Sequence, residues 1–304
     1  MSAQSTGVVQ VPGSDPDMKA DSPGRDAFRR LLRHRLAIVG IVVIAMLAVL
    51  AVLGDEFRAY DQRLKPAFVN QAPGASADSL LGTDALGRDL LSRLLVGGRI
   101  SIVVAVLSVA LSTFIGVLVG VLAGYLGGRV DNLLMRIVDV VLSFPGILLL
   151  LVVSAIVGPG VATLIVIIGA VNWAPASRIV RGQTLALRES TFIEAARVVG
   201  VSNGRVILGH ILPNIVAPVI VFATFGIASV IIFETGLSYL GLGVQPPTPS
   251  WGNMLIAARS ITVLERYPWQ WAFPAGCIVL MVLAVNFVGD SLRDALDRRA
   301  SSSR

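Results

Sequence analysis

Six long apolar runs limit what this chain can fold into more than any other feature of its sequence. They cover residues 36–53, 100–126, 137–157, 161–180, 215–244 and 271–288. About 20 apolar residues in a helix cross a bilayer core that is roughly 30 Å thick. The mean hydropathy is +0.79 and only 14% of the residues are charged, so a soluble globular fold is excluded. We predict an all-α polytopic membrane protein with six transmembrane helices.

The basic residues predict how the chain is threaded through the lipid bilayer. Five arginines, at positions 25, 29, 30, 33 and 35, precede the first run, and four more follow the last run. With the N-terminus inside, 17 of the 25 basic residues lie on the inner side. Because cytoplasmic loops carry the excess of Lys and Arg, both tails (1–35 and 293–304) are predicted to be cytoplasmic. The net charge of +6 therefore reflects orientation and does not indicate nucleic-acid binding.

Several kinds of chemistry are excluded by what the sequence lacks. One cysteine and two histidines predict neither a metal cluster nor an internal disulfide. The only lysines, Lys19 and Lys65, are not part of a phosphate-binding loop, so no cofactor is expected in this chain and ATP with magnesium would bind elsewhere. Residues 200–204 match G-x-S-x-G, but Ser202 follows a predicted helix in a polar loop, whereas a serine nucleophile needs a strand-to-helix turn. No catalytic residue is assigned.

The longest polar segment between the runs is the loop 190–213, and it predicts two short helices. Thr191 and Glu194 have the spacing of a capping box, which starts a helix. Gly200 suits the left-handed cap that ends it. Ser202 or Asn203 can then cap a second short helix over residues 205–212, and Pro213 either ends this helix or joins it to the next membrane span.

This loop resembles the EAA loop of permease subunits in bacterial ABC importers. The residues that carry the resemblance are Glu194, Ala195, Ala196, Gly200, Ser202, Leu212 and Pro213. His210 stands where the general pattern has Ile, which is similar to the peptide and nickel importer branch. In that family the loop is the coupling helix that docks on the ATPase subunit.

The outer segment 54–99 carries a second motif, G-T-D-A-L-G-R-D. Thr83 or Asp84 is predicted to cap an amphipathic helix whose leucines, at positions 86, 90, 91, 94 and 95, form one apolar stripe at the membrane surface. The motif resembles a signature of the C-type permease subunits of dipeptide and oligopeptide importers. Its residues are Gly82, Thr83, Asp84, Gly87, Arg88 and Asp89.

A few polar and small residues stand out within the apolar runs. Arg136 and Asp139 are predicted to form an ion pair at a helix end, and Pro145 should kink the same helix. Arg178 lies near the inner interface, and Asp139 and Arg178 either line a translocation path or make polar contacts between helices. Glu234 is the most deeply placed acid, so it either lines a translocation path or fixes helix packing.

Glycines 116, 120 and 124 form a small-xxx-small repeat that favours close helix packing. Residues 245–270 contain four prolines, too many for one full helix, and are a plausible docking surface for a substrate-binding protein.

The resemblance covers residues 31–297 and implies the fold of a type I ABC importer permease, with a core of five helices over residues 100–292. It also implies a second homologous permease, two P-loop ATPase subunits and an extracytoplasmic binding protein. The implied location is the cytoplasmic membrane, and the implied cargo is a dipeptide or oligopeptide. Related nickel and glutathione importers share these motifs and remain alternatives. A self-sufficient secondary transporter is the alternative from another class, but paired charges in the two halves of a repeat are not seen.

Overall fold

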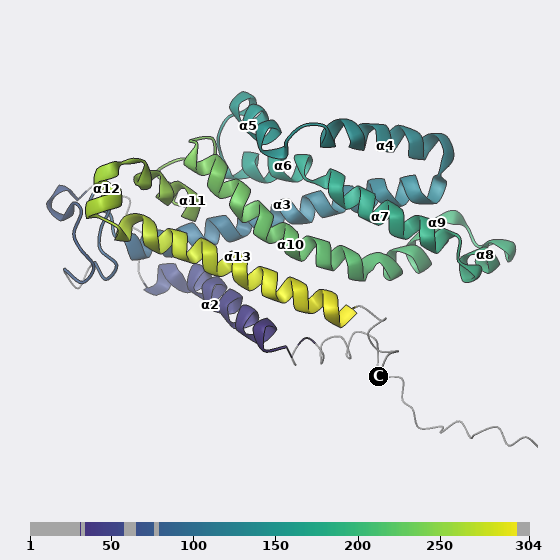
Figure 1. Ribbon diagram of the computed structural model, residues 1–304, viewed down its shortest axis with the longest axis horizontal. Helices are drawn as coiled ribbons and strands as arrows, with labels where there is room; N and C mark the ends of the chain where they lie inside the picture. Colours follow the sequence, from purple (N-terminus) through teal and green to yellow (C-terminus); the bar gives the residue numbers. More distant parts are fainter. Residues whose placement is uncertain (1–30, 32–33, 58–64, 76–78, 297–304) are drawn as a thin grey trace, which may run out of the picture.

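The protein is a bundle of long helices (Figure 1). The computed structural model describes residue 31 and residues 34–57, 65–75 and 79–296, and within these ranges there is no strand beyond an isolated bridge between Thr83 and Asp89. Most of the predicted tails, including the arginines at 25–33 and 298–304, lie outside the described residues.

The structure contains six candidate membrane spans among its described residues. Five are continuous or nearly so, and the sixth is a bent pair of helices. The elements that form them are α2 (Arg35–Phe57), α3 (Leu90–Leu126), α4 (Gly128–Leu142) with α5 (Gly146–Val157), α6 (Val161–Val171) with α7 (Trp173–Arg188), α10 (Leu212–Tyr239) with the short helices before it, and α13 (Trp269–Leu296). The predicted all-α fold is confirmed, and the described residues hold five spans, or six if the bent pair is one span.

The third span is broken where the sequence predicted a kink. α4 and α5 meet at 85° on either side of Ser143–Pro145. A proline disfavours helical backbone in the residue before it and lacks an amide hydrogen. Pro145 has a ψ of 121°, outside the helical region, so the helix ends and a new one starts.

The amphipathic outer helix is the first part of α3, and the prediction of a separate helix capped by Thr83 or Asp84 was wrong. α3 begins at Leu90, and the Asp89 carboxylate caps it by accepting the Ser92 amide proton at 2.8 Å. Asp84 cannot cap this helix because its carboxylate binds the amides of Leu86 and Arg88 within a turn. The helix then continues without a break to Leu126, so residue 100 is not a boundary.

The glycine repeat of α3 packs against α7, which confirms the predicted close approach. A Cβ atom on Gly116 would lie 2.5 Å from the Ala176 Cβ, and one on Gly120 would lie 2.6 Å from the Ser177 carbonyl oxygen. These distances are too short for any side chain, so glycine is required for the two backbones to meet.

The remaining helices enclose a core within the membrane-spanning region. α2 lies along α13, and α10 packs against both α13 and α3. Leu150, Ile168 and Ile231, from three different spans, are fully buried in this core.

The proline-rich outer segment forms only short helices, as predicted. The short elements are η1 (Pro66–Phe68), α8 (Thr191–Val198), α9 (Asn203–Val206), η2 (Ile207–Ile211, a π-helix), α11 (Trp251–Met254), η3 (Leu255–Arg259) and α12 (Ile261–Arg266).

Candidate functional site

The loop 190–213, called the elbow below, projects from the end of the bundle as α8 and α9 (Figure 1). α8 starts after Ser190, whose carbonyl accepts the amide protons of Ile193 and Glu194. The predicted capping box of Thr191 with Glu194 was wrong, because Thr191 is already the first helical residue. The Ser190 hydroxyl makes no side-chain cap either, since it donates to the Leu187 carbonyl.

The predicted left-handed end of α8 at Gly200 is confirmed. Gly200 has a φ of +82°. Its amide donates to the Arg197 carbonyl, and the next amide, of Val201, donates to the Ala196 carbonyl, each at 3.0 Å. These two bonds define a Schellman motif. The chain therefore reverses at a fixed angle between α8 and α9.

The second helix of the elbow passes into the next membrane span at Pro213, which is one of the two predicted outcomes. α9 starts after Ser202, and the run then continues through the π-helical turn Ile207–Ile211 into α10. Leu212 and Pro213 are the first two residues of α10, and Leu212 packs against the core below the elbow. Proline is tolerated in a first helical turn. The elbow is thus rigidly joined to a membrane helix.

A separate hydrophobic cluster anchors the elbow to the bundle. Ile193 of α8 and Val206 of α9 are fully buried in it. They pack with Val121 of α3, Val180 of α7 and Ile215 of α10. The elbow is therefore packed onto the ends of three membrane helices.

Tyr125, at the end of α3, holds both arms of the elbow. Its hydroxyl donates to Asn203 Oδ1 on α9 at 2.8 Å. The guanidinium of Arg197 on α8 lies over its ring, 5.0 Å from the centroid, in cation–π geometry. The side chain is only 4% exposed. One residue of α3 thus fixes α8 relative to α9.

The tip of the elbow exposes apolar side chains. Val198 is 83% exposed and Val199 is 78% exposed, beside the left-handed turn. Glu194 and Ala195 on α8 are also exposed. Exposed apolar residues on a rigid, projecting element are typical of a protein-docking surface.

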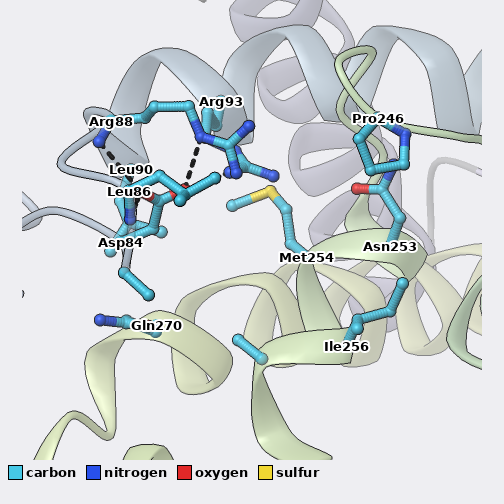
Figure 2. Close-up of a pocket in the computed structure, with 12 residues that line it drawn as sticks. Asp84, Leu86, Arg88, Leu90, Arg93, Pro246, Asn253, Met254, Ile256 and Gln270 are labelled. Atoms are coloured by element: carbon cyan, nitrogen blue, oxygen red, sulfur yellow. Dashed lines mark hydrogen bonds and ion pairs between the residues drawn. The ribbon is translucent and has the colours of Figure 1, made fainter. Parts of the chain in front are cut away.

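The outer motif is organised around Asp84 (Figure 2). Its Oδ1 accepts the amide protons of Leu86 and Arg88 at 2.8 and 2.9 Å. Its Oδ2 accepts from Arg88 Nε at 2.8 Å and from Arg93 on α3. This carboxylate therefore closes the turn over Gly87 and attaches it to α3. A cavity of about 220 Å³ opens beside it, toward Met254.

Thr83 joins the same motif to the start of α13. Its carbonyl accepts from the Gln270 side chain at 3.2 Å, and its hydroxyl accepts the Gln71 amide proton at 2.8 Å. Gly82 packs so closely that a Cβ would lie 2.6 Å from the Gln71 carbonyl oxygen. The motif thus ties residues 65–71 to two membrane helices, and Asp89 begins the first of them.

Glu234 lies in a polar cluster within the packed interior, where it contacts three serines. It is fully buried. Its Oε1 accepts from the Ser238 and Ser250 hydroxyls at 2.7 and 2.8 Å, and its Oε2 lies 3.3 Å from the Ser101 hydroxyl. These serines belong to α10, to the N-cap of α11 and to α3. Of the two predicted roles, the geometry favours packing.

Asp139 pairs with Arg178, not with Arg136, so the predicted helix-end pair was wrong. Asp139 Oδ1 accepts from Arg178 Nη2 at 2.6 Å, across from α4 to α7. A second ion pair between the same helices joins Asp131 to Arg181. α7 places Arg178 and Arg181 beside α4, so Asp139 pairs between helices and not along its own helix.

Sequence reasoning missed the residues that hold these sites together. Tyr125 bonds to Asn203, which is 78 positions later in the sequence, and Ser101 bonds to Glu234, which is 133 positions later. A tyrosine at the end of an apolar run was an available signal for Tyr125, but its partner could not be inferred from spacing.

The fold defines a polytopic membrane protein with an elbow that projects at one end, and the comparisons place it in a family. Residues 116–302 match the model of the binding-protein-dependent transport system inner membrane component. Residues 22–73 match the N-terminal TM domain of oligopeptide transport permease C. The first of these covers more than half of the chain.

Curated relatives agree over almost the full length. The chain is 42% identical over 283 residues to the oligopeptide transport system permease protein OppC of Escherichia coli K12 (92% of this chain and 93% of OppC). It is 39% identical over 292 residues to the dipeptide transport system permease protein DppC of Alkalihalophilus pseudofirmus (96% and 95%). It is 44% identical over 287 residues to the glutathione transport system permease protein GsiD of Shigella flexneri (94% of each).

The chain therefore belongs to the family of binding-protein-dependent transport system inner membrane components. It is a multi-pass inner-membrane permease of the ABC importer class.

Proposed function

We propose that this chain is the C-type permease subunit of an importer that moves dipeptides or oligopeptides into the cytoplasm. The relatives named for dipeptide and oligopeptide transport support this cargo. The relative named for glutathione transport supports a second candidate of similar chemistry, because glutathione is itself a tripeptide.

The coupling role of the elbow rests on one observation: its apolar tip is exposed while its base is buried. Val198 projects from a turn whose other side is held by Ile193 and Tyr125. In this proposal the tip docks on a separate P-loop ATPase. Closure of two such ATPases on ATP then moves the ends of α3, α7 and α10, because the buried cluster links them to the elbow. A nucleotide can drive this change only through different affinities for the two conformations.

The complete importer would contain this chain, a second homologous permease, two ATPase subunits with ATP and magnesium, and an extracytoplasmic binding protein. The elbow and both tails would lie in the cytoplasm. The loops around Asp84 and residues 245–268 would then face the binding protein outside.

A charged substitution at the tip tests the coupling role. Val198→Asp should abolish recovery of the ATPase subunits with the tagged permease, because a buried carboxylate without a partner opposes docking. Ile261→Asp is a matched control, since Ile261 is also highly exposed, at 71%, but lies on α12 at the other end of the molecule. Equal recovery of ATPase with both variants would contradict the proposed docking site.

The energy source provides an independent test. Peptide uptake by cells should survive a proton uncoupler that leaves ATP intact and should stop when ATP is depleted. Uptake with the reverse sensitivity would indicate a secondary transporter.

A further inference from the structure

An ion pair lies exposed on the side of two membrane-spanning helices. The side chains of Asp139 on α4 and Arg178 on α7 are 51% and 53% exposed, although they bond to each other at 2.6 Å. The other ion pair between these helices, Asp131 with Arg181, is more enclosed, with exposed fractions of 14% and 33%. The Asp139–Arg178 pair is therefore the more exposed of the two.

The depth of the exposed pair follows from the packing of α7 on α3. Ser177, next to Arg178, meets α3 between Gly116 and Gly120. These glycines come six to ten residues before Leu126, where α3 ends. At 1.5 Å per residue, Arg178 lies roughly 9–15 Å inside the end of the apolar run. Charged groups at such depth almost always face a protein interior or a water-filled cavity rather than lipid.

The exposed surface of α4 is polar on one side. Asn132, Arg136, Asp139 and Ser143 follow one another at intervals of four, three and four residues, so they share one helix face. All four are exposed. A separate exposed face of the same helix carries Val130, Leu133, Ile137 and Val140. Figure 1 shows α4 along one edge of the bundle, next to α7. Lipid suits the apolar face, whereas the polar face requires water or polar groups.

We propose that the polar face of α4 borders the peptide path and that Asp139 and Arg178 bind the charged ends of the passing peptide. When the pair separates, Arg178 binds the terminal carboxylate and Asp139 binds the terminal ammonium. This inference rests on the proposed peptide cargo. The chemistry is suitable because guanidinium groups bind carboxylates through paired hydrogen bonds, and an ion pair exposed to water is only weakly held together. Arg136 on the same face adds a second positive charge.

Thiol labelling tests whether this face borders water. In a Cys277→Ser background, Ser143→Cys places a thiol on the polar face, and Val279→Cys places one on α13, where Val279 is 55% exposed in a membrane span. A charged, membrane-impermeant maleimide should label Ser143→Cys in the assembled importer, either with or without ATP, and should not label Val279→Cys. Protection of Ser143→Cys in both nucleotide states would overturn the proposal.

Uptake of modified peptides tests the ligand. The probes are trialanine, its C-terminal amide and its N-acetyl form, each supplied to the complete importer. Arg178→Gln should lower trialanine uptake about tenfold, as expected for the loss of one charge-assisted contact, and should affect the amide much less. Asp139→Asn should likewise affect trialanine much more than the acetylated peptide.

A charge swap separates binding from simple helix pairing. The double variant Asp139→Arg/Arg178→Asp keeps an ion pair between α4 and α7 but exchanges the two charges. Restored uptake of all three peptides by the swap would show that the pair only joins two helices and would overturn the proposal. As a control, Arg181→Gln removes the enclosed pair between the same helices, so it should change uptake of all three peptides by the same factor.

Uptake of trialanine by the wild-type importer separates a failure of the proposed function from a failure of the binding role of Asp139 and Arg178. If it shows no ATP-driven uptake of trialanine, the proposed function fails. If that uptake is present but the variants keep the wild-type ratios among the three peptides, only the binding role of Asp139 and Arg178 fails.

Discussion

Substitution of Gly200 by valine should uncouple ATP hydrolysis from transport. Gly200 holds a φ of +82° in the turn between α8 and α9, and a Cβ atom there would meet nothing within 4 Å. The penalty is therefore conformational rather than steric. A left-handed backbone costs a residue other than glycine about 1–2 kcal/mol, and the β-branched valine is at the upper end. That penalty lowers the ratio of capped to uncapped elbow roughly five- to thirtyfold.

The structural consequence is loss of the two hydrogen bonds that close the Schellman motif. The apolar tip then no longer keeps a fixed angle to the buried base of the elbow. The buried cluster around Ile193 is not touched, so the permease should still insert and purify normally. The assay is peptide uptake and ATP hydrolysis by the complete importer in proteoliposomes, and the expected result is fewer peptides imported for each ATP hydrolysed.

Two variants in the same elbow serve as controls for this prediction. Gly204→Val also places valine in open space, but at a helical position, so it should keep wild-type coupling. Gly200→Asn should be close to wild type, because asparagine tolerates left-handed backbone. A wild-type ratio of uptake to hydrolysis in Gly200→Val would refute the reasoning.

Three further substitutions probe the packing that supports the sites. Gly120→Val should destabilise the α3–α7 contact by about 1–3 kcal/mol, because its Cβ would lie 2.6 Å from a backbone oxygen. Gly276→Val is the control, because a Cβ at that position has nothing within 4 Å. Equal thermal midpoints of the two variants in detergent would contradict the predicted contact. Tyr125→Phe keeps the ring under Arg197 but loses one hydrogen bond worth about 0.5–1.5 kcal/mol, so proteolysis within residues 190–205 should accelerate. An unchanged cleavage rate would argue against the role of Tyr125 in holding α8 and α9 together. Glu234→Leu leaves buried hydroxyls without their acceptor, at about 1–3 kcal/mol for each one that finds no new partner, and should lower the thermal midpoint more than Glu234→Gln does.

The large features of the fold could be predicted because they depend on local composition. Each apolar run is long enough to span a bilayer by itself, so the number of spans follows from the sequence. Gly200 was predictable for the same reason, since the residue that tolerates left-handed backbone stands where one helix must end. The close approach of α3 also follows from its own glycine spacing, although the identity of its neighbour does not.

The errors arose where the chemistry or spacing of a residue fits more than one partner or conformation. Arg136 has suitable spacing for Asp139 along one helix, but α7 brings Arg178 to it from 39 positions away. Thr83 and Asp84 have the chemistry of helix caps, but the turn at Gly87 already uses the Asp84 carboxylate. Ser190 precedes Thr191 and is an equally good N-cap residue, so the capping pattern alone could not fix the helix start. The break at Pro145 shows the same limit, because proline is compatible with either a kink or a new helix.

The central claim is that this chain transports only as part of an assembly powered by other subunits. The most direct measurement is to purify the tagged protein from its native membrane in mild detergent, identify the accompanying chains by mass spectrometry, and test uptake after reconstitution. The account predicts stoichiometric recovery of a second permease and P-loop ATPases, with uptake only when these subunits and ATP are present. Recovery of the chain alone, with uptake retained in its reconstituted form, would contradict it.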